Sequence, residues 1–385
     1  MVSLSNKTIL ILSPQSWGNM FVSKHHYAIE LAKSGNTVYF LNPPDQVKVN
    51  RNKSIEIKAS GIHTDLYLVE HRLSFSYQLK FRAMPVFHWF MRFHIQKLLK
   101  EIGKDIDIVW SFDLGNLYPL NYFGNRFKIF HPVDEPQNKH AIKAAKGADI
   151  IFSVTTEILE KYRSFPVNRH FINHGVTENF IVNELQTTVG NPVRIGFSGN
   201  LLRNDIDRKT LLAIITKNQD CVFEFWGSYK QAQGNVGGVE DESMKQFIRS
   251  LQSQSNVILH GAIPSSSLAA ELKRMDAFLI CYDVQKDQSK GTNYHKIMEY
   301  LATGKVIISN NVTTYDDQEW LVRMVKERTN NDLLPDLFHE TVSRLAIYNN
   351  EELMRKRKDY ALNNTYHRQL EMIDLFIHRS TTTSL

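Results

Sequence analysis

The first forty residues contain the pattern that most restricts how this chain can fold. Thr8 to Ser13 is an apolar run typical of a buried β-strand. In Val22 to Ser34 the apolar residues have helical spacing, and this segment ends before Gly35. Val38 to Leu41 is a second short apolar run. A strand, a helix and a strand at this spacing form a βαβ unit, which requires a parallel sheet with a right-handed crossover. The intervening loop has no G-x-G-x-x-G, so a tight dinucleotide site is not predicted.

The same alternation continues along the chain and starts again after a polar segment. Further strands are predicted at 107–111, 128–130, 148–155, 194–198, 222–226, 257–260, 277–282 and 306–309. A chain of 385 residues is long for a single core. We therefore predict an α/β protein with two doubly wound parallel-sheet domains, residues 1–180 and 193–360. Residues 181–192 are polar and lack periodicity, which is typical of a linker.

The amino-acid composition is that of a globular protein, but it does not identify a binding partner. Hydrophobic residues make up 42% of the chain and charged residues 22%, as in soluble globular proteins. The formal net charge of +6 is compatible with nucleic acid, an anionic membrane surface or phosphorylated ligands, and does not choose among them. Cys221 and Cys281 lie in apolar runs and read as buried thiols. With no signal-peptide pattern and no apolar run of membrane-spanning length, we predict a cytoplasmic protein.

The loop after the first strand carries a group of polar and aromatic residues. Trp17, Gly18, His25 and His26 lie between the strand and the first turn of the following helix. In an open α/β sheet such loops line the crevice beyond the carboxyl ends of the strands. We predict these four residues to contact an acceptor substrate. The alternative is that the histidines are ordinary surface residues at the start of a helix.

Two acidic residues follow the next parallel strands. Asp113 comes after the strand 107–111, and Asp134 comes after the strand 128–130. Either carboxylate is placed to take a proton from an acceptor hydroxyl as a general base, with Asp134 the first candidate and Asp113 the second. The alternative is that Asp113 caps a loop and Asp134 caps the next helix.

The segment 72–100 combines basic and aromatic side chains and contains no acidic residue. This composition fits a helix that lies on an anionic bilayer. It also fits a crossover helix whose aromatic residues belong to the core. Single-stranded nucleic acid would use a similar composition, but nothing else in the chain supports it.

The stretch 291–310 joins a polar loop, a short helix and a strand. The helix is predicted from Lys296 to Thr303, Gly304 ends it, and the strand begins at Val306. Lys296 and Glu299 are three residues apart and share one face near the helix N-terminus, where an anion is favoured. A lysine there strengthens a phosphate site, and the carboxylate can accept hydrogen bonds from a ribose diol. The alternative is an ordinary ion pair on a solvated helix.

This stretch also resembles a known signature. The pattern K-x-x-E-Y-x-A-x-G-K is formed by Lys296, Glu299, Tyr300, Ala302, Gly304 and Lys305. It is similar to the nucleotide-sugar signature in the C-terminal domain of GT-B glycosyltransferases, especially the glycosyltransferase family 4-like group. In that group the glutamate holds the ribose hydroxyls of a nucleoside diphosphate sugar. Tyr294 and Val306 stand where relatives often have proline.

The resemblance extends to other donor-binding residues. Members of the group have a glycine after the first strand of this domain, then an arginine and, five residues further on, a lysine that bind the diphosphate. Gly199 matches the glycine, whereas Asn200 and Asp205 occupy the other two positions. Arg203 and Lys290 are the available substitutes. The resemblance further implies that His260 flanks the base and that Asn293 in the polar loop belongs to the donor site.

The resemblance implies a fold and an activity. The fold would be GT-B, two Rossmann-like domains facing a central cleft, with a C-terminal helix in 361–385 that crosses back to the first domain. The activity would be transfer of a sugar from a UDP- or GDP-type donor to a hydroxyl of a glycan or lipid-linked acceptor in bacterial surface polysaccharide synthesis. Since there is no clear D-x-D motif, metal independence is predicted, with no cofactor besides the nucleotide sugar and no nucleic-acid partner.

Several questions stay open at the level of sequence. A sugar-nucleotide epimerase of the same fold and a non-catalytic nucleotide-sugar-binding protein are the alternative functions. Asp134 as a base would suit inversion of the anomeric carbon, whereas the family resemblance implies retention. If the segment 72–100 binds lipid, the protein would lie at the inner face of the membrane.

Overall fold

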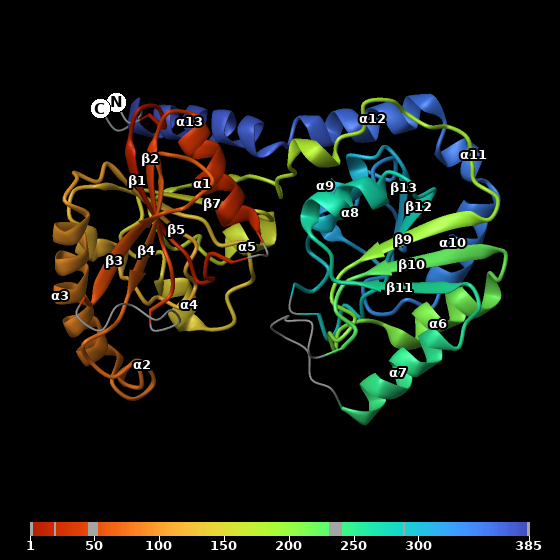
Figure 1. Cartoon of the computed structure of the whole chain (residues 1–385), viewed down its shortest axis with the longest axis horizontal. Helices are drawn as coiled ribbons and strands as arrows, with labels where there is room; N and C mark the ends of the chain where they lie inside the picture. Colours follow the sequence, from red (N-terminus) through yellow and green to blue (C-terminus); the bar gives the residue numbers. More distant parts are fainter. Residues whose placement is uncertain (1–2, 19–20, 45–52, 231–240, 288, 383–385) are drawn as a thin grey trace. The chain divides into compact units, whose positions relative to one another are not determined.

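The protein consists of two compact units. The structure, a computed structural model, describes residues 3–18, 21–44, 53–230, 241–287 and 289–382. The first unit comprises Met1–Asn173 and Tyr366–Leu385, and the second comprises His174–Thr365 (Figure 1). The segment 181–192, which was predicted to be a linker, belongs to the second unit, because its residues form hydrogen bonds with that unit. Val182 N donates to Ala302 O at 3.2 Å, and Lys305 Nζ donates to Gln186 O at 2.5 Å.

The first unit is built on an eight-stranded sheet with the order β3-β4-β2-β1-β5-β6-β7-β8. All pairs are parallel except β3 with β4, which are antiparallel. The strands are β1 (Thr8–Leu12), β2 (Thr37–Leu41), β3 (Ile55–Ala59), β4 (Leu66–His71), β5 (Ile108–Ser111), β6 (Phe127–Phe130), β7 (Ile150–Ser153) and β8 (Asn168–Phe171).

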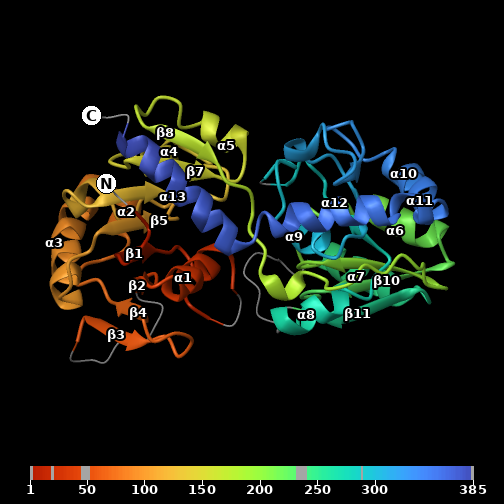
Figure 2. The same ribbon diagram turned by 90° about the horizontal axis from the view of Figure 1, so that it is seen from above.

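Helices cover this sheet, and one of them comes from the end of the chain. They are α1 (Ser23–Lys33), α2 (Leu79–Arg82), α3 (Met84–Ile102), α4 (Lys139–Lys143), α5 (Thr156–Glu160), α13 (Tyr366–Thr382) and the 3-10 helix η1 (Leu120–Phe123). α13 packs beside α1 in the first unit (Figure 2). Tyr27 donates its hydroxyl hydrogen to Gln369 Oε1 at 2.5 Å, and the rings of His26 and Tyr366 stack 4.8 Å apart.

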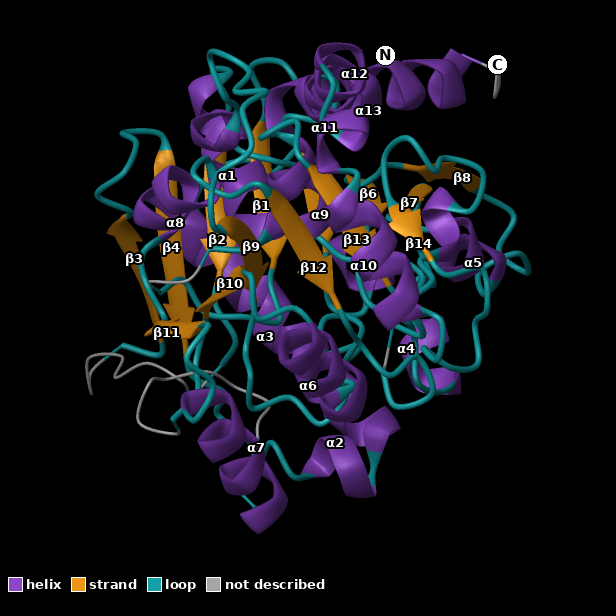
Figure 3. Ribbon diagram, turned by 90° about the vertical axis from the view of Figure 1, so that its right-hand side faces the viewer, coloured by secondary structure: helices purple, strands orange, loops and turns teal. Residues whose placement is uncertain are grey.

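The second unit has a six-stranded parallel sheet with the order β11-β10-β9-β12-β13-β14 (Figure 3). Its strands are β9 (Val193–Ser198), β10 (Cys221–Trp226), β11 (Val257–Gly261), β12 (Ala277–Ile280), β13 (Val306–Ser309) and β14 (Arg323–Met324). Its helices are α6 (Arg208–Lys217), α7 (Glu242–Gln252), α8 (Ser265–Leu272), α9 (Lys296–Leu301), α10 (Leu334–Ser343), α11 (Leu345–Tyr348), α12 (Glu351–Leu362) and the 3-10 helices η2 (Glu178–Phe180) and η4 (Thr313–Tyr315).

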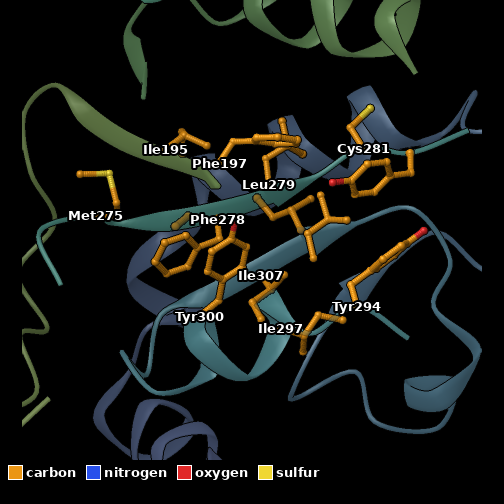
Figure 4. Close-up of a cluster of buried hydrophobic side chains, with 14 of the residues drawn as sticks. Ile195, Phe197, Met275, Phe278, Leu279, Cys281, Tyr294, Ile297, Tyr300 and Ile307 are labelled. Atoms are coloured by element: carbon orange, nitrogen blue, oxygen red, sulfur yellow. The ribbon is translucent and has the colours of Figure 1, made fainter. Parts of the chain in front are cut away.

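The core of the second unit joins α9 to the middle of its sheet. Figure 4 shows Phe197 of β9, Phe278 of β12 and Ile307 of β13 beside Ile297 and Tyr300 of α9. The rings of Phe278 and Tyr300 stack at a centroid distance of 4.1 Å. Burying these apolar side chains fixes α9 against the sheet and so fixes the direction of its two polar residues, Lys296 and Glu299.

The predicted fold class, two parallel-sheet α/β domains, is confirmed. The strands β3, β4, β8 and β14 were not predicted. β3 and β8 lie at the two edges of the first sheet and carry mixed polar sequences, IEIKA and NRHF, because an edge strand has less surface to bury. Both cysteines are buried and free, as predicted.

Candidate active site

The candidate donor site lies where the order of the second sheet reverses. β9 has β10 on one side and β12 on the other, so successive connections leave in opposite directions from this point. In sheets of this kind ligands bind beyond the carboxyl ends of the strands at the reversal. Ser198 and Gly199 stand at that end of β9, and Tyr282 follows β12.

Lys296 is buried beneath the end of β9. Its ammonium group donates to Tyr282 Oη at 2.6 Å and to the carbonyl oxygen of Ser198. Gly199 has a φ of +151°, and a Cβ built on it would lie 2.6 Å from Lys296 Nζ, so only glycine fits here. Burial, with a smaller contribution from the nearby guanidinium of Arg203, lowers the pKa of Lys296 to about 7.

Glu299 lies one turn further along α9 and makes no ion pair with Lys296, although both residues are in the described part of the chain. Burial raises the pKa of Glu299 to about 7, and the charge of Lys296 opposes that rise. The ordinary i,i+3 ion pair, which the sequence left open, is therefore not what the structure contains. Lysine and glutamate are instead two separate polar groups, each with an ionisation equilibrium close to neutral pH.

Arg203 is held by two carboxylates. Its Nε donates to Asp205 Oδ1 at 2.8 Å, its Nη2 donates to Asp205 Oδ2, and Nη2 lies 3.5 Å from Asp287 Oδ1. Asp287 also accepts hydrogen bonds from the Gly291 amide at 3.2 Å and the Tyr294 hydroxyl at 2.7 Å. The charge of Arg203 is thus already compensated, and the guanidinium connects the loop after β9 to the loop before α9.

The remaining predicted donor residues lie on β11 and in the loops that follow β9 and β12. The His260 ring stacks on Trp226 at 4.9 Å with an interplanar angle of 6°, and its Nε2 lies 2.8 Å from Glu224 Oε2. Asn200 Oδ1 accepts a hydrogen bond from Leu202 N at 2.9 Å. Asn293 is buried, whereas Lys290 is exposed and has a φ of +51°.

In the first unit, the polar groups of Trp17 and His25 after β1 are already engaged in hydrogen bonds within the protein. His25 is buried; its Nδ1 accepts from Val22 N at 3.1 Å, and its Nε2 lies 3.2 Å from Ser16 O. Burial lowers the pKa of His25 to about 4. Trp17 donates its amide hydrogen to Asn42 Oδ1 at 2.7 Å, and Gly18 is exposed. His26 stacks on Tyr366. His25 is therefore not the surface residue that the alternative interpretation required.

The two candidate bases differ in their surroundings. Both oxygens of Asp113 accept backbone hydrogen bonds, from Gly115 N at 2.7 Å and Leu117 N at 2.6 Å. This matches the loop-capping alternative. Asp134 is exposed, and it does not cap α4, because Asn138 does so through Oδ1. Asp134 is the carboxylate of the two that is open to a substrate.

Lys24 and His131 are two buried polar residues of the first unit that were not among the predicted site residues. Lys24 is buried in the first turn of α1, and its pKa is lowered to about 8 by burial, against the attraction of Asp134 and Asp113. His131 follows β6; it is fully buried, and neither ring nitrogen has a hydrogen-bond partner among the described residues. Burial lowers its pKa to about 3, so the ring is neutral. The only available signals were the position of His131 directly after β6 and that of Lys24 in the first turn of the helix that follows β1.

The comparisons with known proteins agree on the architecture. Neither a protein-family model nor a curated protein sequence matches the chain. Sucrose-phosphate synthase from Thermosynechococcus elongatus is similar in structure, with a TM-score of 0.70 and 11% identity, covering 98% of this chain and 100% of that one.

Two other structures match with the same coverage, 98% of this chain and 100% of theirs. The lipopolysaccharide outer core galactosyltransferase WaaB has a TM-score of 0.60 and 12% identity. HepE of Anabaena, in complex with UDP and glucose, has a TM-score of 0.61 and 12% identity. At such identities the likeness concerns the fold. Taken with the two α/β sheets, it shows that the chain has the GT-B fold.

Proposed function

We propose that the protein is a glycosyltransferase that uses a nucleoside diphosphate sugar of UDP or GDP type. The observation that carries the proposal is the position of Lys296 beneath Gly199, with Glu299 one turn away, at the reversal of the second sheet. Among proteins of similar fold, HepE has been solved with UDP and glucose, and the pneumococcal O-GlcNAc transferase GtfA with UDP and GlcNAc.

The donor's diphosphate is held by the buried lysine. In the free protein Lys296 donates only to neutral oxygens, and burial disfavours its charged form. A diphosphate at the end of β9 would stabilise that charge. Lys290 is exposed and available to the same anion. Arg203 positions the loop before α9, since its charge is already matched by Asp205 and Asp287. Glu299 accepts hydrogen bonds from the ribose hydroxyls.

The acceptor is bound by the first unit, and Asp134 removes the proton from its hydroxyl. The exposed carboxylate has the freedom that this step requires, whereas the oxygens of Asp113 are engaged by backbone amides. Trp17, Gly18 and His26 border the same strand ends, and His25 positions their loop. A base in this place suits inversion of the anomeric carbon. The acceptor is a glycan or a lipid-linked glycan of bacterial surface polysaccharide synthesis.

Turnover with a panel of UDP- and GDP-sugars tests this proposal. The protein should release free nucleoside diphosphate when given a glycan or lipid-linked acceptor, and Asp134→Asn should lower that rate at least 100-fold while donor binding persists. Conversion of one sugar nucleotide into another without nucleotide release would indicate an epimerase. Donor binding with no turnover of any acceptor, and no effect of Asp134→Asn, would indicate a non-catalytic binding protein.

A further inference from the structure

The segment 72–100 places its aromatic residues on two opposite surfaces. The buried side of α3 is formed by Phe87, Met91, His94, Ile95, Leu98 and Ile102. Trp89 and Phe93, one turn apart, point away from that side and are 55% and 51% exposed. Phe81 of α2 is 77% exposed, and Val86 is 46% exposed. The core interpretation of this segment therefore holds for some of its aromatic residues, such as Phe87, but not for Phe81, Trp89 and Phe93.

Three of the exposed residues lie along one face of α3. Val86, Trp89 and Phe93 follow the i, i+3, i+7 spacing that aligns side chains along one face of a helix. The Trp89 ring contacts both Phe93 and Phe90, at centroid distances of 5.0 and 4.9 Å. α2, which carries Phe81, packs against α3 (Figure 1). Clusters of exposed aromatic side chains on a soluble protein mark interaction sites.

The charged side chains of the segment 72–100 are all basic. Arg82, Arg92, Lys97 and Lys100 are exposed, and none of them forms an ion pair with a described residue. There is no acidic residue between Arg72 and Lys100. Elsewhere on the protein exposed cations are commonly paired, as in Arg163 with Glu160 and Arg355 with Glu351. Unpaired cations beside a stripe of apolar side chains complement a layer that has an apolar interior and anionic groups at its surface.

We propose that the exposed face of α2 and α3 docks onto an anionic lipid bilayer. This docking face consists of Phe81, Val86, Trp89, Phe93, Arg82, Arg92, Lys97 and Lys100. Its aromatic rings enter the boundary between headgroups and acyl chains, and the cations bind the lipid phosphates. None of the described helices is long and apolar enough to cross a membrane, so the contact is peripheral. The proposal rests on the proposed function only in that a lipid-linked acceptor would lie in the same bilayer.

Flotation with vesicles tests the docking face. We expect the wild-type protein to float with vesicles that contain phosphatidylglycerol at low salt, and to do so much less with pure phosphatidylcholine or at high salt. The apolar variant Phe81→Ser, Trp89→Ser and Phe93→Ser should bind at least tenfold more weakly. Its matched control is Leu333→Ser, Ile347→Ser and Leu375→Ser, whose side chains are 63%, 52% and 56% exposed and which should float like the wild type.

The contribution of the cations is tested by comparing two triple variants that remove the same number of positive charges. Arg82→Gln, Arg92→Gln and Lys97→Gln should weaken binding by about fivefold for each cation removed. Lys146→Gln, Lys217→Gln and Lys245→Gln remove three exposed lysines elsewhere and have the same net charge, so they should keep most of the affinity. Equal losses in both sets would mean that net charge alone drives binding, and would overturn the docking face.

Two further results would also overturn the proposal. One is a folded wild-type protein that does not float with anionic vesicles at low salt. The other is a wild-type dimer that Phe81→Ser, Trp89→Ser and Phe93→Ser convert to a monomer, because the face would then join two copies of the chain. Nucleoside diphosphate binding, measured on the same samples, separates failure of this proposal from failure of the proposed glycosyltransferase function, since the docking residues lie outside the donor unit.

Discussion

The most informative residue of the proposed donor site is Lys296, because it is buried without a carboxylate partner. Its pKa of about 7 reflects burial, and a bound diphosphate would raise that pKa. At pH 8.5 the free protein carries Lys296 mostly neutral and Glu299 ionised. Nucleotide binding at that pH should therefore bring a proton onto Lys296, whereas Glu299 has no proton to exchange.

Calorimetry in buffers of different ionisation enthalpy measures this proton uptake. We expect close to one proton taken up per nucleoside diphosphate bound at pH 8.5, and an affinity that falls up to about tenfold per pH unit between pH 8 and 9. Lys296→Met should abolish the uptake and weaken binding. Binding heats that are independent of the buffer in the wild type would show that Lys296 does not hold the anion.

Lys24 supports a second prediction, on the acceptor side. Its ammonium faces Asp134 and Asp113, and its pKa is lowered to about 8. If the charged form positions Asp134, acceptor turnover should decline as the pH rises through about 8. Lys24→Arg keeps the charge at all accessible pH values and should move that decline to higher pH. Lys24→Met should lower kcat/KM for the acceptor by about 10- to 100-fold and leave nucleotide binding unchanged. An identical pH profile in Lys24→Arg would contradict this role.

Sequence reasoning found some of these residues and missed others for physical reasons. Lys296 and Glu299 share a helix face and follow a recognisable spacing, so they could be proposed as donor residues from the sequence. Lys24 and His131 matter because they are buried together with few partners, which only tertiary packing decides. The pairing of Arg203 with Asp205, two residues away, depends on the loop conformation, and so its compensated charge could not be predicted either.

At the scale of elements, α9 is joined to β9 by Tyr300. Its hydroxyl accepts from Ser198 N at 2.7 Å and lies 2.9 Å from Ser198 Oγ, in a fully buried position. Tyr300→Phe leaves the Ser198 amide without this partner, so we expect the second unit to lose about 1–3 kcal/mol of stability. Urea unfolding measures the loss. Tyr122→Phe, where no hydrogen bond to the described residues is removed, should change stability little; equal effects would contradict the role of Tyr300.

In the segment 72–100, the sequence could predict the helix but not the burial of its individual aromatic residues. Its helix could be inferred from its position between strands, but not which aromatic residues it buries. That division follows from the rotation of α3 against the sheet, which places Phe87 and Met91 inside and Trp89 and Phe93 outside. The central strands, by contrast, were predicted well, because strands buried on both faces have continuous apolar sequences.

At the scale of the whole molecule, the proposed chemistry uses no metal ion. Lys296 and Lys290 would neutralise the leaving diphosphate. We expect turnover to be unchanged, within about twofold, after treatment with EDTA and removal of the chelator. Loss of turnover that only Mn²⁺ or Mg²⁺ restores would contradict this part of the account, and would leave the fold assignment untouched.

The central claim is that the second unit binds a nucleoside diphosphate through Lys296 and Glu299. The most direct test is the thermal stability of the wild type and of Glu299→Ala with UDP, GDP, ADP, CMP and dTDP. A ligand at about 100 times its dissociation constant stabilises the folded state by about 2.7 kcal/mol. The account predicts that one nucleoside diphosphate raises the Tm of the wild type clearly, and that of Glu299→Ala much less. If no nucleotide stabilises the wild type, or if Glu299→Ala responds equally, the donor site is not where we place it.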